Sequence, residues 1–324
     1  MKRRHLLSAA LAAPLPPRTA AAQQRGTFPA RPITVTVGFP PGAISDVVTR
    51  AIAQRMGREL SQTLVVDNRP GAGTSVAAAH VVQSAPDGYA LLMASNSLAT
   101  NHVALPHLPP RDPMRDLTPI GLAYRSPFIL LVGKDVPARD LREFLAYAKS
   151  KPGHVNFASS GTGAVNHLAL ELLNQRAGVT MEHVAYRGGA PALMDLRAGR
   201  VHAFFATVLD SAPLLRDGVA QVLAVSTAER LPQFPEAPAI AEQVPGYEAV
   251  FWQGLFAPAG TSEPVIARLA RALQAATSDP ELVGSMRDRG VDLLHSGPAD
   301  LHAYLAREIQ NWGQLIRAAN IRLE

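Results

Sequence analysis

Three short turns rich in glycine and hydroxyl residues carry the clearest binding chemistry of this sequence. They are GFPPGAISD at 38–46, ASSGTG at 158–163 and YRGGAP at 186–191, and each precedes residues with helical spacing. The free N–H groups at the start of a helix attract anions, and glycine lets a ligand approach the backbone closely. The turns therefore suit a carboxylate or a phosphate, although a tight strand-to-helix connection without a ligand also explains each one taken singly.

Several side chains in and near these turns allow more than one interpretation. Ser45 or Asp46 can cap the helix that follows the first turn. Arg187 can pair an acid through two hydrogen bonds, but we favour a structural role in which it braces a loop or the two halves of the protein. His167 lies near Ser159, Ser160 and Thr162 in the sequence and could be a catalytic base beside a nucleophile. No motif orients it, however, and we favour a structural role.

Motifs of common enzyme classes are absent from the sequence. It has no G-x-S-x-G elbow, no H-E-x-x-H zinc helix, no complete G-x-G-x-x-G and no Gly-Lys-Ser/Thr after the second turn. It also has no cysteine, which excludes thiol nucleophiles and zinc–thiolate sites. Asp46, Asp67 and Asp210 could pair across a cleft, but sequence alone does not show this. We therefore expect a binding protein with no catalytic residue, metal or cofactor.

The segments around these turns alternate between strand and helix patterns. A first series is expected at 33–39, 45–60, 64–67, 75–84 and 90–94, in the order strand, helix, strand, helix, strand. In the second series we expect strands at 128–132, 155–158, 182–185, 201–206 and 221–226, and helices at 141–150, 163–176 and 190–198. This alternation is typical of two α/β units with parallel strands.

The C-terminal segment differs, because three helical stretches follow a strand at 251–257 with no strand between them. These stretches lie near 262–278, 280–289 and 298–319, and they must cover a sheet formed elsewhere. We therefore expect the chain to cross between lobes near 124–128 and 247–256. The predicted domains are a first lobe at 28–126 plus 250–324 and a second lobe at 127–249.

The N-terminal residues 1–22 are predicted to be a signal peptide. Lys2, Arg3 and Arg4 precede an apolar stretch at 6–15, and three alanines at 20–22 suit a cleavage site. The arginine pair leaves both twin-arginine and Sec export open, and either predicts a periplasmic protein. The formal charge of +5 comes from 31 basic and 26 acidic residues, and removing this segment leaves 27 against 26. A nucleic-acid partner is therefore not expected.

Five ordered segments of the chain resemble the substrate-binding proteins of tripartite tricarboxylate transporters, also called the Bug family. The segments are RPITVTVGFPPGAISDVVTRAIAQRM, VVDNRPGAG, APDGYALLMAS, FASSGTGAVNHLALE and VAYRGGAPALMDLRAGRVHAFF. The resemblance runs from about residue 28 to the C-terminus. It implies an α/β fold of the two-lobed, type II periplasmic-binding-protein kind, with a ligand cleft between the lobes. In that family the ligand is held by backbone amides, hydroxyls and ordered waters.

The resemblance also implies a function and a set of ligand-binding residues. The function is capture of a small carboxylate (a di- or tricarboxylate, an acidic amino acid or an aromatic acid) by a monomeric protein, for the permease subunits of a transporter. A periplasmic sensing partner of a signalling system is the alternative. The expected ligand-binding residues are Phe39, Pro40, Gly42, Ala43, Ser45, Asp46, Ser95, Ser159, Ser160, Gly161, Thr162, Gly163, His167, Arg187, Gly188, Ala190, Thr207 and Asp210.

Two positions depart from the pattern of that family. Ala43 stands where the first turn usually carries a second glycine, and its methyl group narrows the approach to the backbone. His202 stands where an acidic residue often follows the Gly-x-Val segment, and we interpret it as a surface change.

Overall fold

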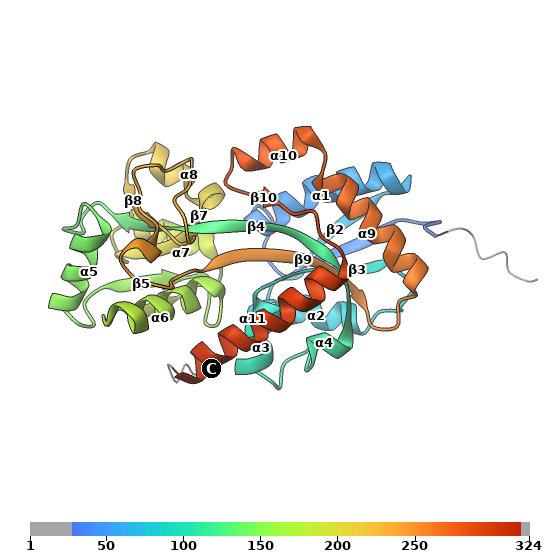
Figure 1. Cartoon of the computed structure of the whole chain (residues 1–324), viewed down its shortest axis with the longest axis horizontal. Helices are drawn as coiled ribbons and strands as arrows, with labels where there is room; N and C mark the ends of the chain where they lie inside the picture. The colour runs from blue at the N-terminus through green and yellow to red at the C-terminus, as the bar shows by residue number, and fades with distance from the viewer. Residues whose placement is uncertain (1–27, 319–324) are drawn as a thin grey trace, which may run out of the picture.

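One long strand, β4 (Leu117–Gly133), runs through both lobes of the computed structural model, which describes residues 28–318 (Figure 1). It has 17 residues, and nearly all of them are buried. From Leu117 to Pro127 it pairs with β9 (Val250–Pro258), and from Phe128 onward it pairs with β7 (Ala203–Thr207) and β8 (Ala220–Val225). The partners of β4 therefore change inside the segment expected to cross between the lobes. The predicted domain boundaries themselves stay a prediction.

The first lobe joins parallel strands by helices at β1, β2 and β3, as the alternating pattern predicts. The pattern did not predict that β9 is antiparallel to both β3 and β4. Its sheet contains β2, β1, β3, β9 and β4 in that order, and the short β10 pairs with β4. Helices α1 and α9 lie on one face of this sheet, and α2, α3 and α11 lie on the other (Figure 1). The further elements of this lobe are β1 (Ile33–Val37), α1 (Ile44–Leu60), β2 (Leu64–Asn68), η1 (Ala72–Thr74), α2 (Ser75–Val82), β3 (Ala90–Ser95), α3 (Ser97–Ala104), α4 (Pro113–Asp116), α9 (Glu263–Thr277), α10 (Pro280–Arg287), β10 (Asp292–Leu293) and α11 (Pro298–Ala318).

The second lobe repeats this construction on the other half of β4. Its strand order is β4, β7, β5 and β6, and β8 pairs with the edge of β4 opposite to β7. Helices α5 and α6 pack on one face of the sheet, and α7 and α8 pack on the other. The remaining elements are α5 (Leu141–Ser150), β5 (Asn156–Ser159), α6 (Val165–Ala177), β6 (Glu182–Ala185), α7 (Gly189–Arg197), α8 (Val208–Arg216) and η2 (Ile240–Glu242).

Helix α1 shows how spacing in the sequence becomes packing. Val48, Ile52 and Met56 recur every four residues, and each is at most 1% exposed. They form one apolar stripe on the helix, which packs against β1 and α9. Burying each such side chain stabilises the fold by about 1.5–3 kcal/mol relative to exposure. A polar residue at Ile52 would therefore separate α1 from its lobe.

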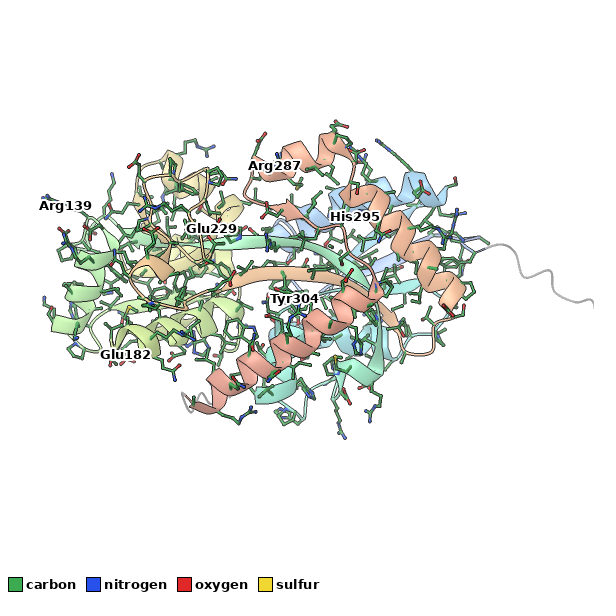
Figure 2. The ribbon with its side chains drawn as sticks, in the orientation of Figure 1. Arg139, Glu182, Glu229, Arg287, His295 and Tyr304 are labelled. Atoms are coloured by element: carbon green, nitrogen blue, oxygen red, sulfur yellow. The ribbon has the colours of Figure 1, made fainter. Side chains whose placement is uncertain are left out.

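Helix α11 returns the end of the described chain to the first lobe. Figure 2 shows Tyr304 between α11 and the long strands, and its ring lies edge-on to that of Trp252, 5.3 Å between centroids. The Glu308 carboxylate accepts hydrogen bonds from the indole N–H groups of Trp252 (2.7 Å) and Trp312 (2.9 Å) and from the Asn96 amide (3.1 Å). Burial raises the pKa of Glu308, although these donors oppose the increase.

The sequence predictions were wrong at several elements. The C-terminal helices were expected without intervening strands, but β10 lies between α10 and α11. The first half of β4 was missed, as were α3 and α8, where polar residues and Pro213 hide the apolar spacing. The predicted signal peptide lies outside the described residues. Within those residues, no helix is both long and apolar enough to span a membrane.

Candidate functional site

A cavity of about 70 Å³ lies between the lobes, where the first residues of five helices meet. The helices are α1, α3, α6, α7 and α8, which contribute Ile44, Ser97, Val165, Gly189 and Asp210 respectively. At α1, α3, α6 and α7 the N-cap residue supplies no side-chain hydrogen bond. The N–H groups of these first turns therefore depend on other acceptors, and together they favour a negative charge.

The first turn folds back on itself and brings its backbone to the cavity. Gly42 has φ 83°, a left-handed conformation that favours glycine, and Ala43 lines the cavity. The Asp46 carboxylate accepts from the Gly42 N–H at 2.9 Å and pairs with Arg50 at 2.8 Å. Burial alone would raise the pKa of Asp46, but Arg50, the Gly42 N–H and Asn68 together lower it. Asp46 therefore holds the turn closed.

The predicted capping role at this turn is wrong. Helix α1 begins at Ile44 with Ala43 as its N-cap, so Ser45 and Asp46 lie inside the helix. Ser45 lines the cavity instead, and its Oγ accepts from the Gln253 amide at 2.9 Å. The hydroxyl of Tyr124 in turn donates to the Gln253 carbonyl oxygen at 2.8 Å. Ser45, Gln253 and Tyr124 therefore form one buried hydrogen-bonded group behind the cavity.

The second turn presents Ser160 to the cavity and is fixed by its neighbours. The Asn166 side-chain oxygen accepts from both the N–H and the hydroxyl of Ser160, each at 3.1 Å. Ser159 lies behind, where its Oγ contacts His183 Nε2 and accepts from the Gly161 N–H. Gly163 has φ 78°, so this turn also needs a residue that tolerates the left-handed region.

His167 faces the protein interior. Its Nδ1 accepts from the Gly163 N–H at 3.0 Å, which places the ring proton on Nε2, 3.7 Å from Glu171. The ring stacks on His183 with 3.7 Å between centroids. Burial, and to a lesser extent His183, lower the pKa of His167 to about 3. His167 is therefore neutral at pH 7 and supports the turn.

The side chain of Asp210, on α8 of the second lobe, reaches the start of α1 in the first lobe. Its carboxylate accepts from the Thr207 hydroxyl at 2.8 Å and also from the backbone N–H of Ile44 at the start of α1. Burial raises the pKa of Asp210, and these two hydrogen bonds oppose the increase. Two further contacts join the lobes: Thr100 Oγ1 donates to Gly163 O at 3.1 Å, and the Gln233 amide donates to Arg287 O at 2.9 Å. The lobes are therefore in contact around the cavity.

Phenylalanine rings form a wall that runs from one lobe to the other. Phe251 on β9 lies 6.0 Å from Phe39 in the first turn and 6.4 Å from Phe128 on β4, measured between ring centroids. Phe128 lies 6.4 Å from Phe205 on β7, and Phe204 also lines the cavity. This wall can pack against an apolar ligand body.

Only some of the expected ligand-binding residues line this cavity. Phe39, Ala43, Ser45, Ser160, Thr207 and Asp210 do. The others lie in the supporting turns or at the surface, and direct ligand contact by them stays a prediction: Pro40, Gly42, Asp46, Ser95, Ser159, Gly161, Thr162, Gly163, His167, Arg187, Gly188 and Ala190. Arg187 and Ala190 are exposed. Ser95 accepts from the Ser97 N–H at 3.3 Å, and Ser97 lines the cavity in its place.

Sequence reasoning missed the other lining residues, and most of them carry no motif of their own. They are Ile44, Ser97, Phe128, Ala164, Val165, Asn166, Gly189, Phe204, Phe205 and Phe251. Phe128 and Phe251 were assigned only to strands, although they begin the strands next to the expected crossings. A larger hollow of about 780 Å³ beside α1 and β2 contains none of the three turns. Among the described residues, no cluster suits a metal ion.

Comparisons with known proteins show the family and the fold of this chain. The family model described as the tripartite tricarboxylate transporter family receptor matches residues 48–321. The structure of Rhodopseudomonas palustris Rpa4515 with adipate is 32% identical, with a TM-score of 0.86 over 91% of this chain and 99% of that one. MatC from the same species, with bound malate, is 32% identical, with a TM-score of 0.82 over 89% and 100%. The periplasmic binding protein BugD is 29% identical, with a TM-score of 0.84 over 91% and 99%.

Proposed function

Because this chain belongs to the tripartite tricarboxylate transporter receptor family, we propose that it captures a small carboxylate outside the cytoplasm and delivers it to permease subunits. One observation carries the proposal for this chain itself. Four helices without side-chain N-caps begin at a single cavity between two lobes. Helix starts are an established way to hold an anion without a basic side chain.

The ligand carboxylate would be held by N–H and O–H donors. The first-turn amides of α6 and α7 supply N–H groups, and Ser97, a hydroxyl residue at the start of α3, also lines the cavity. Hydrogen bonds to an ionised acceptor are about twice as strong as neutral ones, so a few of them suffice for specific binding. Rpa4515 and MatC, whose ligands are adipate and malate, support a carboxylate as the ligand class.

A binding role without chemistry is supported by the state of the titratable groups. His167 is turned toward the Gly163 N–H and has a pKa of about 3, so it does not face the cavity as a base. Asp210, the ionisable residue that lines the cavity, already accepts two hydrogen bonds. No histidine or lysine that could activate a hydroxyl nucleophile lies among the lining residues of the described chain.

Ligand entry requires the lobes to separate. The cavity lies between two lobes that are in contact around it. We expect an organic acid to bind an open form and to be enclosed as the lobes approach. The crossings at Pro127–Phe128 and next to Val250 are the expected hinges.

The proposal is tested by identifying the ligand directly. Native mass spectrometry of freshly purified protein should show a co-purified organic acid at one molecule per chain. A panel of organic acids should raise the melting temperature, since a ligand that binds only the folded state stabilises it by RT ln(1 + [L]/Kd). A shift with sugars or cations and none with any acid would overturn the proposal. Periplasmic fractionation and transport assays with the permease subunits test delivery separately.

A further inference from the structure

The cavity holds very little positive charge for an anion-binding site. Its lining includes five phenylalanines, and Asp210 is its ionisable side chain. Within residues 28–318, no lysine or arginine lines it. The cation of the first turn, Arg50, is paired with Asp46 and is half exposed outside the cavity. Any ligand carboxylate must therefore be stabilised by helix starts and hydroxyls alone.

One of the helix starts is already occupied by the protein's own carboxylate. Asp210 accepts from the Ile44 N–H at the start of α1 and from the Thr207 hydroxyl at the start of α8. The start of α3 is also taken, because Ser95 Oγ accepts from the Ser97 N–H at 3.3 Å. The starts of α6 and α7 remain for a ligand, at Val165 and Gly189. This arrangement leaves two helix starts for one ligand carboxylate.

A second carboxylate on the same ligand has no favourable position. Against the wall formed by Phe39, Phe251, Phe128 and Phe205 it would lose its hydration without gaining hydrogen-bond donors. Beside Asp210 it would meet a like charge in a buried site, which costs several kcal/mol in binding interfaces. An apolar body packs well on the same wall.

We propose that the cavity selects acids with one carboxylate and an apolar aromatic or aliphatic body, and that Asp210 rejects a second carboxylate. This inference rests on the carboxylate-binding function proposed above. It separates this chain from Rpa4515 and MatC, since adipate and malate each carry two carboxylates. Asp210 is thus a specificity-determining residue.

Matched acids test the selection in the wild-type protein. Hexanoate and adipate share a six-carbon chain and differ by one carboxylate, and benzoate and terephthalate form a rigid aromatic pair. Titration calorimetry at pH 7 should show each monoacid binding on the order of tenfold or more tightly than its diacid partner. Asp210→Asn should reduce the ratio of monoacid affinity to diacid affinity in both pairs, mainly because the diacid binds more tightly. Asp217→Asn, at the far end of α8 in an ion pair with Arg197, is the matched control and should leave the ratios unchanged.

The outcomes separate the inference from the function. Equal or tighter diacid binding by the wild type overturns the selection and leaves carboxylate binding in place. A wild-type preference that survives unchanged in Asp210→Asn overturns the role of Asp210. If none of the four acids binds the folded wild type or the variant, the selection fails, and the wider panel of organic acids decides whether carboxylate binding fails as well. Far-UV circular dichroism checks folding, and Asp210→Ser, which can still accept from Thr207, is the second variant.

Discussion

The hydrogen bond between Thr100 and Gly163 gives a sharp test of lobe closure. Thr100 lies in α3 of the first lobe and is fully buried, and its Oγ1 donates to Gly163 O in the second turn at 3.1 Å. Thr100→Val keeps the side-chain shape and removes only this donor. Because the bond joins the lobes, it exists in the closed form and is lost when they separate.

The size of the effect follows from the worth of one hydrogen bond. A typical intramolecular hydrogen bond contributes about 0.5–1.5 kcal/mol net. Ligand affinity depends on the fraction of protein in the closed form, so the variant should bind about 2- to 12-fold more weakly. Stability within each lobe should change little, because the other contact of the hydroxyl, to Ser97 O, is long at 3.4 Å.

Titration calorimetry of the best-binding acid measures this change directly. Thr277→Val is the matched control, because that buried hydroxyl donates to Gln274 O within its own helix, α9. Spin labels at the exposed Glu59 and Lys149, one on each lobe, should show a larger open population in free Thr100→Val than in free wild type. If Thr100→Val binds the acid as tightly as the wild type and shows the same label distances, the reasoning is refuted, because opening of the lobes would then not break this hydrogen bond.

Three further predictions concern the turns and the hinge. Gly163→Val should abolish ligand binding and lower the free energy of unfolding by about 1–3 kcal/mol, because φ 78° strains a branched residue. Gly178→Val is the control: it is strained at φ 63° at the C-terminus of α6 and should still bind the ligand. Ligand binding by both variants would show that the second turn is not at the ligand. Asp46→Ala should weaken binding several-fold and destabilise the fold by about 1 kcal/mol through the lost contact with the Gly42 N–H. Because folding lowers the pKa of Asp46, its carboxylate stabilises the fold above its ordinary pKa of 3.8, and this contribution should disappear as the pH falls below that value. Denaturant titrations measure it: if Asp46→Ala still has a lower free energy of unfolding than wild type at low pH, the expectation is contradicted. The radius of gyration from small-angle scattering should decrease on adding the acid, and if neither it nor the label distances change at saturation, the pocket is rigid and preformed.

Local patterns were sufficient for most of the secondary structure. The four-residue spacing of Val48, Ile52 and Met56 predicted α1 because one face of that helix is buried. The same criterion did not predict α3, because its sequence SLATNHVA carries polar residues and no apolar repeat. Ser95, expected as a ligand contact, ends the preceding strand, and its contact with a ligand stays a prediction, whereas Ser97 lines the cavity.

The shape of the cavity was beyond local patterns. It joins residues from 39 to 251, brought together by pairing among strands far apart in the sequence. Residues of all three glycine-rich turns line the cavity, and their contact with a ligand stays a prediction. Nothing local showed that Phe128 and Phe251 would meet, or that Asp210 would reach the start of α1, since each depends on the crossing of β4 between the sheets.

The position of β9 has a consequence for how the chain folds as it is synthesised. β9 pairs with both β3 and β4, and it begins only at Val250. The paired strands of the second lobe all lie between residues 128 and 225 and emerge earlier. We therefore expect the second lobe to fold while the first still exposes the edges of β3 and β4. A chain that ends before Val250 would keep those edges open, and it should aggregate by strand pairing with other chains.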